Sequence, residues 1–104
     1  MNKYSELSDD AINRLIAERV MGGKYHPAID KFSTDETTFF REVVPRMAEL
    51  GMNLLFDNDR RSGEWAAEVL HCRKVSSFGP YVNKSIARAG CESALLAMDA
   101  MEAK

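Results

Sequence analysis

Residues 33–73 carry the sequence STDETTFFREVVPRMAELGMNLLFDNDRRSGEWAAEVLHCR, which predicts a capped helix followed by two strands. Ser33 and Glu36 have the spacing of a capping box, in which each side chain bonds the backbone N–H of the other residue. Apolar residues then recur at steps of three and four, as on a helix that packs against a sheet. Gly51 follows where a left-handed residue would end the helix. We therefore expect a helix over residues 34–50.

The remainder of this stretch predicts an antiparallel hairpin. Residues 52–57 form a compact apolar run, and residues 64–73 alternate between two faces. The turn between them is rich in aspartate, asparagine, serine and glycine, which are the residues that turns favour. Both faces of the second strand carry apolar residues, so we expect helices to cover both faces of the sheet.

Pro45 interrupts the expected helix. Proline lacks an N–H, and in an α-helix its ring would meet the carbonyl group of Arg41. The apolar stripe nevertheless continues in phase beyond the proline. We therefore keep one helical segment and expect either a kink near Arg41 or two shorter helices.

Two further helices flank this unit. Ser8 is a good N-cap with acidic residues directly after it, and it predicts a first helix over residues 8–21 that ends at a Gly-Gly pair. Asn83 is the expected N-cap of a last helix over residues 83–102. The packed face of this last helix is rich in small residues, which would let a neighbouring element approach closely.

Together these elements predict an α+β protein with one domain over residues 1–104. The expected architecture is a small α/β/α sandwich with a central antiparallel hairpin and three helices. A further short strand is expected from residues 24–32 or from residues 74–79. A chain of this length buries a modest core, so association with other chains would add stability.

Composition excludes several classes of protein. The chain has 104 residues, of which 45% are hydrophobic, and a formal net charge of -2, which gives no general attraction to nucleic acid or to an anionic membrane surface. No apolar run reaches the roughly 18 residues of a membrane span, and the N-terminal residues are polar and acidic, unlike a signal peptide. Cys72 and Cys91 form no motif, so we expect reduced thiols in the cytoplasm.

Several segments, taken in order along the chain, resemble one family. They are LSD at 7–9, LIAERVMG at 15–22, FSTD at 32–35, Trp65 on the second strand and ARAGCESALLA at 87–97. These segments resemble the layout of the phage ABA-sandwich domain proteins. The NinX-like small phage proteins have a similar layout, including the LSD start. The resemblance covers nearly the whole chain.

The resemblance implies an α/β/α sandwich of phage or prophage origin, working in the cytoplasm of a bacterial host. It implies no established activity, and it supplies no catalytic residue. The sequence departs from the family pattern at Pro45, where an uninterrupted helix is expected, and at Gly90, where an apolar residue is expected.

The sequence offers no catalytic, metal-binding or cofactor-binding constellation, and we expect none. His26 and His71 are not spaced as metal ligands, and a zinc site needs about four ligands that converge. Cys91 falls on the packed face of the last helix, where cysteine behaves as a small hydrophobic residue. Asp57 and Asp59 lie at the hairpin turn, where aspartates are common for conformational reasons.

The candidate binding residues lie on three surfaces. The connection over residues 24–32 contains a proline and is expected to be a loop that carries a tyrosine and a histidine. The hairpin turn carries two adjacent arginines. The second strand carries a tryptophan that is expected to be buried under a helix, or, if exposed, to anchor an interface. Four basic residues, at the end of the second strand and the start of the last helix, predict either an anion-binding cluster or solvated surface charge. The candidates are Tyr25, His26, Arg60, Arg61, Trp65, Arg73, Lys74, Lys84 and Arg88.

The leading functional hypothesis is a non-enzymatic phage or prophage accessory protein that acts by binding. One version is a counter-defence inhibitor that masks a host protein or sequesters a nucleotide signal. The expected partners are a host protein or a small anionic ligand, rather than a membrane or nucleic acid. One alternative is a small nucleotide- or phosphoester-directed enzyme that uses Asp57, Asp59 or His71. Another is a structural subunit that forms homo-oligomers through the helix at 83–102.

Overall fold

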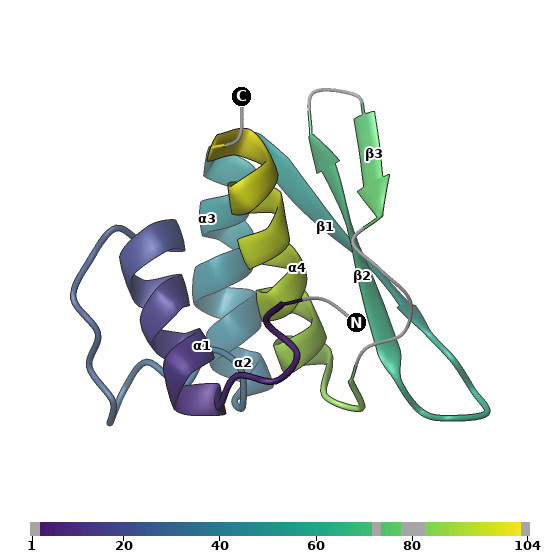
Figure 1. Ribbon diagram of the computed structural model, residues 1–104, viewed down its shortest axis with the longest axis horizontal. Helices are drawn as coiled ribbons and strands as arrows, with labels where there is room; N and C mark the ends of the chain where they lie inside the picture. The colour runs from purple at the N-terminus through teal and green to yellow at the C-terminus, as the bar shows by residue number, and fades with distance from the viewer. Residues whose placement is uncertain (1–2, 72–73, 78–82, 103–104) are drawn as a thin grey trace.

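Helix α4 (Ile86–Glu102) is the element against which the rest of the molecule packs (Figure 1). The computed structural model describes residues 3–71, 74–77 and 83–102. Every residue of α4 from Ala87 to Leu95 is buried, as expected for a helix covered on all sides. The small residues in this part of α4 allow that coverage. From Ala87 to Leu95 this helix is covered within one chain, so this part of it is not available as the predicted homo-oligomer interface. That the chain forms homo-oligomers stays a prediction.

The start of α4 differs from the predicted one. Ser85, rather than Asn83, caps the helix, because its Oγ accepts a hydrogen bond of 3.2 Å from the backbone N–H of Arg88. The Asn83 side chain accepts instead from the N–H of Ser85, at 2.8 Å. The carbonyl oxygen of Asn83 accepts a bond of 2.6 Å from the N–H of Trp65, which ties the helix start to the sheet.

The first helical segment begins where the sequence predicts. It comprises α1 (Asp9–Leu15) followed by η1, a π-helical turn (Ile16–Val20). Ser8 is the N-cap, and its side chain accepts a 3.1 Å bond from the N–H of Ala11. Gly22 follows this segment with a φ of 71°, a conformation that glycine adopts without strain. This segment lies against α4 (Figure 1).

The middle helical segment is interrupted where Pro45 predicts an interruption. It comprises α2 (Glu36–Thr38), the π-helical turn η2 (Phe39–Val43) and α3 (Val44–Glu49). The N–H of Val44 bonds the carbonyl of Phe39, five residues back. The wider turn ends at Val43, two residues before Pro45, and includes Arg41, whose carbonyl group the proline ring would meet in a regular α-helix.

The cap of this middle segment is shifted from the predicted position. Asp35 is the N-cap, and its side chain accepts a 3.2 Å bond from the N–H of Thr38. Ser33 is 1% exposed and bonds across the fold instead. Its N–H and its hydroxyl group both lie 2.8 Å from Oδ1 of Asn13. The predicted capping box at Ser33 is therefore wrong, and this serine joins the loop to α1.

The predicted hairpin is confirmed, and a third strand extends it. Strands β1 (Met52–Asn58), β2 (Trp65–His71) and β3 (Lys74–Ser77) form an antiparallel sheet in the order β1-β2-β3. The extra strand comes from the predicted segment 74–79, whereas residues 24–32 form turns.

The three helical segments lie on one side of the sheet (Figure 1). The side chains of Met52, Ala67 and Val69 on this side are buried. Leu55 points to the other side and is 46% exposed. Within the described ranges the α+β class and the packing of helices on a hairpin are confirmed, but the expected helical layer on the second face is not seen. No described helix is long and apolar enough to cross a membrane.

Candidate functional site

The loop over residues 22–32 contains two of the predicted binding residues. Tyr25 is held against α1, because its hydroxyl group donates a 2.6 Å hydrogen bond to Asp10 and the guanidinium of Arg14 lies 5.0 Å from its ring centre. The bond to Asp10 also raises the pKa of Tyr25. His26 is exposed, and its backbone N–H donates to the carboxylate of Asp30 at 2.8 Å. Tyr25 therefore has a structural role, whereas the imidazole of His26 faces solvent.

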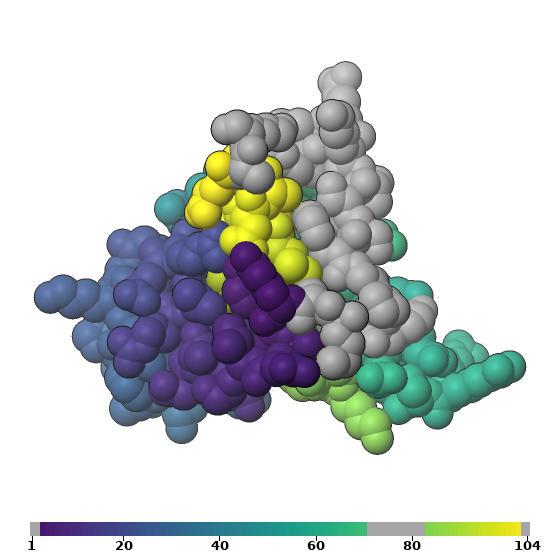
Figure 2. Space-filling model, viewed as in Figure 1, coloured from purple at the N-terminus to yellow at the C-terminus, as the bar shows by residue number. Residues whose placement is uncertain are grey.

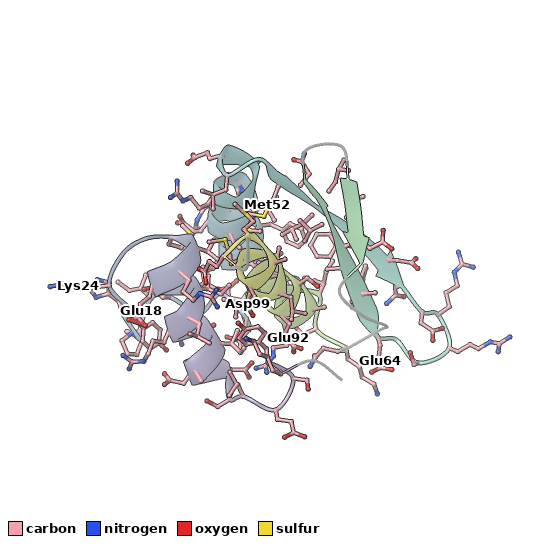
Figure 3. The ribbon with its side chains drawn as sticks, turned by 45° about the horizontal axis from the view of Figure 1, so that its top comes forward. Glu18, Lys24, Met52, Glu64, Glu92 and Asp99 are labelled. Carbon is pink, nitrogen blue, oxygen red and sulfur yellow. The ribbon has the colours of Figure 1, made fainter. Side chains whose placement is uncertain are left out.

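A cavity of about 180 Å³ lies beside this loop. Its floor is formed by buried side chains from the first helical segment, the loop and α2, namely Ala17, Phe32 and Thr38. Its rim carries charged and titratable side chains of both signs, and Lys24 extends outward from the loop (Figure 3). The rim residues with such side chains are Lys24, His26, Asp30, Arg41 and Glu42.

The size of this cavity limits its contents. Ligand pockets for drug-sized molecules usually have volumes of about 300–1,000 Å³, whereas a cavity of about 150 Å³ holds a benzene molecule. The cavity beside His26 can therefore take one phosphate-sized or ring-sized group. A whole nucleotide exceeds it.

The turn between β1 and β2 presents Arg60 and Arg61, and we call residues 57–64 the hairpin tip. The backbone of this tip is fixed by its own hydrogen bonds. The Asp59 carboxylate accepts from the N–H of Arg61 at 3.0 Å and from the hydroxyl of Ser62 at 3.1 Å. The N–H of Gly63 donates to the carbonyl of Asp59, and Gly63 has a φ of 76°.

Both arginines of the hairpin tip are exposed. The hairpin tip, coloured teal, projects beyond the helices (Figure 2). Among the described residues no ion pair involves either guanidinium group. The hairpin tip thus holds two cationic side chains on an ordered turn, which is an arrangement suited to contact with an acidic surface.

Among the described residues, the predicted cluster of basic residues between the second strand and the last helix is not assembled. Arg73 lies outside the described residues, and only the backbone of Lys74 is described. Lys74 pairs with His71 at one end of β2, while Asn83, next to Lys84, bridges Trp65 at the other end. Six strand residues at about 3.3 Å each separate these ends by roughly 20 Å.

Trp65 and Lys84 differ in exposure. Trp65 is half-buried on the helix-facing side of β2, on the face that also carries Ala67. Lys84 is exposed. Trp65 is thus partly covered rather than buried as predicted. Neither residue contributes to an assembled site among the described residues.

Arg88 is not a surface cation, and both interpretations that placed it on the surface are wrong. It is 6% exposed and donates from every part of its guanidinium group. Nε donates to Glu92 at 2.7 Å and Nη1 to Asp9 at 2.8 Å. Nη2 donates to two backbone carbonyls of the N-terminal segment, of Tyr4 at 2.9 Å and of Leu7 at 2.7 Å. Arg88 therefore fastens this segment to α4.

A second polar network fastens the same segment to the other end of α4. Oδ2 of Asp99 accepts a 2.6 Å bond from the hydroxyl of Tyr4 and lies 3.0 Å from Nζ of Lys3. Oδ1 of Asp99 accepts from the guanidinium of Arg19 at 2.7 Å. Glu92 and Asp99 both lie on the part of α4 that faces the first helix (Figure 3). Sequence reasoning missed these networks, because their partners are far apart in the chain.

The surroundings of Asp99 make stability depend on pH. Partial burial opposes ionisation, but the hydrogen bonds from Tyr4, Lys3 and Arg19 outweigh it and lower the pKa of Asp99 from 3.8 to about 2. A depressed folded-state pKa contributes stability that is present above the unfolded value and is lost as the pH falls through the folded value.

We therefore expect the wild-type protein to lose the contribution of Asp99 as the pH falls from about 4 to about 2. The loss should be about 2 kcal/mol of unfolding free energy. Urea melts of wild type and Asp99→Asn at several pH values measure it, and the difference between them should shrink over this range. The exposed Glu18→Gln variant should keep a constant difference from wild type. A constant difference for Asp99→Asn would contradict the prediction.

The residues of the enzymatic alternative do not meet. Asp57 pairs with Ala66 and His71 pairs with Met52, so they are separated by roughly 16 Å along the sheet. Asp59 is occupied by the turn that it organises.

The described residues also contain neither a metal-ligating cluster nor an activated thiol. No group of three or more histidine, cysteine, aspartate or glutamate side chains is placed to hold a metal ion in the part of the chain that the structure covers. Cys91 is fully buried, and burial raises the pKa of its thiol, which suppresses the nucleophilic thiolate.

The chain was compared with protein-family models, with curated proteins and with solved structures. No match was found in any of the three comparisons, so the resemblance to the phage ABA-sandwich proteins stays a prediction from the sequence segments quoted above.

Proposed function

We propose that this protein is a phage or prophage accessory protein that acts by binding in the host cytoplasm, and that it masks a host protein as a counter-defence inhibitor. The observation that carries the binding role is the hairpin tip with Arg60 and Arg61. The phage setting and the counter-defence role rest on the resemblance of the sequence segments alone.

The hairpin tip supports protein masking better than sequestration of a nucleotide signal. Arginine is enriched among the residues that dominate binding energy in protein interfaces, and an ordered turn reduces the entropy lost on binding. The cavity beside His26, in contrast, is too small for a whole nucleotide. The expected partner surface is acidic, because Arg60 and Arg61 are the exposed charged side chains of the turn itself, and the carboxylate of Asp59 is engaged in the hydrogen bonds of that turn. Asp57 is also exposed, but it belongs to β1 and precedes the turn.

Reversing both charges with Arg60→Glu and Arg61→Glu should abolish capture of the partner. Tagged wild-type protein, incubated with bacterial host lysate, should retain one protein in stoichiometric amount. The double variant should bind that protein at least about tenfold more weakly, because two cations would be replaced by like charges. Thermal melting of the variant checks that the turn still folds.

The matched control is Lys24→Glu with Lys31→Glu, which reverses two exposed charges on the loop beside the cavity. This variant should capture the partner as well as wild type does. Failure of wild type to retain any stoichiometric protein would contradict the proposal. Loss of binding in the loop variant alone would assign the contact to the loop and reject the hairpin tip.

A further inference from the structure

Among the described residues, β1 has one hydrogen-bonded neighbour, β2, so its other side is an edge of the sheet. Figure 1 shows β1 and β3 on either side of β2 in the upper part of the sheet. Edge strands are usually protected from pairing by proline, lysine, a bulge or short length. β1 has neither proline nor lysine, its one charged residue is Asp57 near the strand end, and it pairs with β2 without a bulge from Met52 to Asn58.

Hydrogen bonds at the hairpin tip determine which peptide groups of β1 point to this free edge. The N–H of Asp59 donates to the carbonyl of Glu64 at 2.9 Å, so this pair is of the hydrogen-bonded type. The two types of pair alternate along an antiparallel ladder. The N–H and C=O groups of Leu54 and Phe56 therefore point away from β2, and no described residue hydrogen-bonds to them.

The sequence of β1 is complementary to itself in one register. In an antiparallel pair of two copies with the two-fold axis at Leu55, Leu55 faces Leu55 and Leu54 faces Phe56. Asn53 then faces Asp57, so polar residues face polar ones. The outward-pointing groups of Leu54 and Phe56 pair with each other, as an antiparallel ladder requires. Moving the axis by one residue would place Leu55 opposite Asn53 or Asp57 instead.

Exposed apolar side chains collect at the same edge. Leu55 is 46% exposed on the sheet face that the described helices leave uncovered. Phe40 is 41% exposed, and its ring centre lies 5.6 Å from that of Phe56. An exposed edge with apolar residues is a template for strand addition, and a second copy is the partner whose side chains match it.

We propose that β1 pairs with β1 of a second copy of this chain, so that the two three-stranded sheets become one continuous sheet across a two-fold axis at Leu55. The interface is isologous, because the same strand contributes from both copies. It is independent of the hairpin tip, which projects from the ends of the joined sheet and stays accessible.

The first test is the oligomeric state of wild type and Leu55→Lys, measured by sedimentation velocity from about 1 to 100 μM, a range that spans micromolar dissociation constants. Wild type should be a dimer at the upper concentrations. Leu55→Lys should weaken dimerisation at least about 100-fold, because two cations would face each other across the axis. Ile29→Lys, which alters a side chain that is 70% exposed on the distant loop, should dimerise like wild type.

The second test fixes the register and does not depend on the stability of the lysine variant. In a Cys72→Ser background, Leu55→Cys should form a disulfide dimer under mild oxidation, because facing residues at the axis have Cα atoms about 4.5 Å apart. Asn53→Cys should not, because its counterpart lies about 13 Å away along the strands. Cys91 is buried and does not compete.

Each outcome decides for or against the proposal. A wild-type monomer at every concentration would overturn it, as would a Leu55→Lys dimer of unchanged affinity. Equal cross-linking of the two cysteine variants would overturn the proposed register. Dimerisation of wild type with selective cross-linking at residue 55 would support it.

Discussion

Replacement of Arg88 by methionine is expected to destabilise the fold by about 3–5 kcal/mol, because it removes the charge that compensates a buried carboxylate. The side chains of Arg88 and Glu92 are 7% and 2% exposed, and they are joined by a hydrogen bond of 2.7 Å. Methionine keeps much of the apolar stem of arginine, so the loss of stability measures the removal of the guanidinium group rather than a change in packing. The N-terminal segment also loses the donor to its carbonyls at Tyr4 and Leu7.

Urea denaturation of three variants distinguishes this explanation from a simple packing defect. Replacing both partners, Arg88→Met with Glu92→Met, should recover a large part of the loss, because an apolar pair of similar volume often replaces a buried ion pair without cost. Arg60→Met, at an exposed arginine of the hairpin tip, should change stability by less than about 0.5 kcal/mol. A double variant that is less stable than Arg88→Met would contradict the charge-compensation argument.

Local signals in the sequence predict much of this fold. The start of the first helix at Ser8 depends on contacts within three residues, and so does the hairpin turn with its aspartates and glycine. Pro45 predicts the interruption of the middle helix for the same reason, since its missing N–H acts within one helical turn. These features depend on contacts between residues that are close in the sequence, so the sequence alone predicts them.

The errors concern contacts between distant parts of the chain. Ser33 fits a capping box, but a bond to Asn13, 20 residues away, gives it another role. The sequence predicts Arg88 as a surface cation, because arginine is almost never fully buried unless it is paired. Its partners are 79 to 84 residues distant, apart from Glu92. The i,i+4 spacing of Arg88 and Glu92 on a face of small residues is the one local sign of a buried pair.

In the candidate site, too, features set by neighbouring residues are predicted correctly and features set by distant contacts are not. Arg60 and Arg61 are correctly placed at an exposed turn, because a polar run between two strands determines both their position and their exposure. The predicted anion cluster is not assembled among the described residues, because Lys74 and Lys84 lie towards opposite ends of β2. This separation follows from the register of the strands, which the sequence does not show. The cavity beside His26 depends on how the loop packs on two helical segments. No short stretch of the sequence predicts this packing.

Gly90 shows how a departure from an expected pattern is explained by one distant side chain. The sequence resemblance predicts an apolar residue at this position on the last helix. In the structure, the ring of Phe39 occupies the space where a side chain at Gly90 would stand. A Cβ atom there would meet Cζ of that ring and would lie 2.9 Å from Cε1 and Cε2. Phe39 is fully buried and makes edge contacts with Phe40 and Phe56, so the ring has little room to move.

We therefore expect Gly90→Ala to destabilise the protein, although alanine favours a helix over glycine by about 1 kcal/mol. Overpacking of a filled core typically costs about 1–3 kcal/mol, and the contact with a fixed aromatic ring places this case at the upper end. The net loss should be about 2 kcal/mol, or a fall of roughly 10 °C in melting temperature. Gly23→Ala is the matched control, because a Cβ atom there meets nothing within 4 Å.

The decisive measurement is the same substitution in a Phe39→Leu background. Leucine lacks the far edge of the ring, so a methyl group at position 90 has space and the helical preference of alanine remains. Gly90→Ala should then be neutral or stabilising relative to Phe39→Leu alone, and its effect should reverse in sign between the two backgrounds. If Gly90→Ala lowers the melting temperature equally in both backgrounds, the ring of Phe39 is not the reason for glycine at this position. A reversal would show that residues 39 and 90 are energetically coupled, which explains a glycine inside a buried helix that propensity alone disfavours.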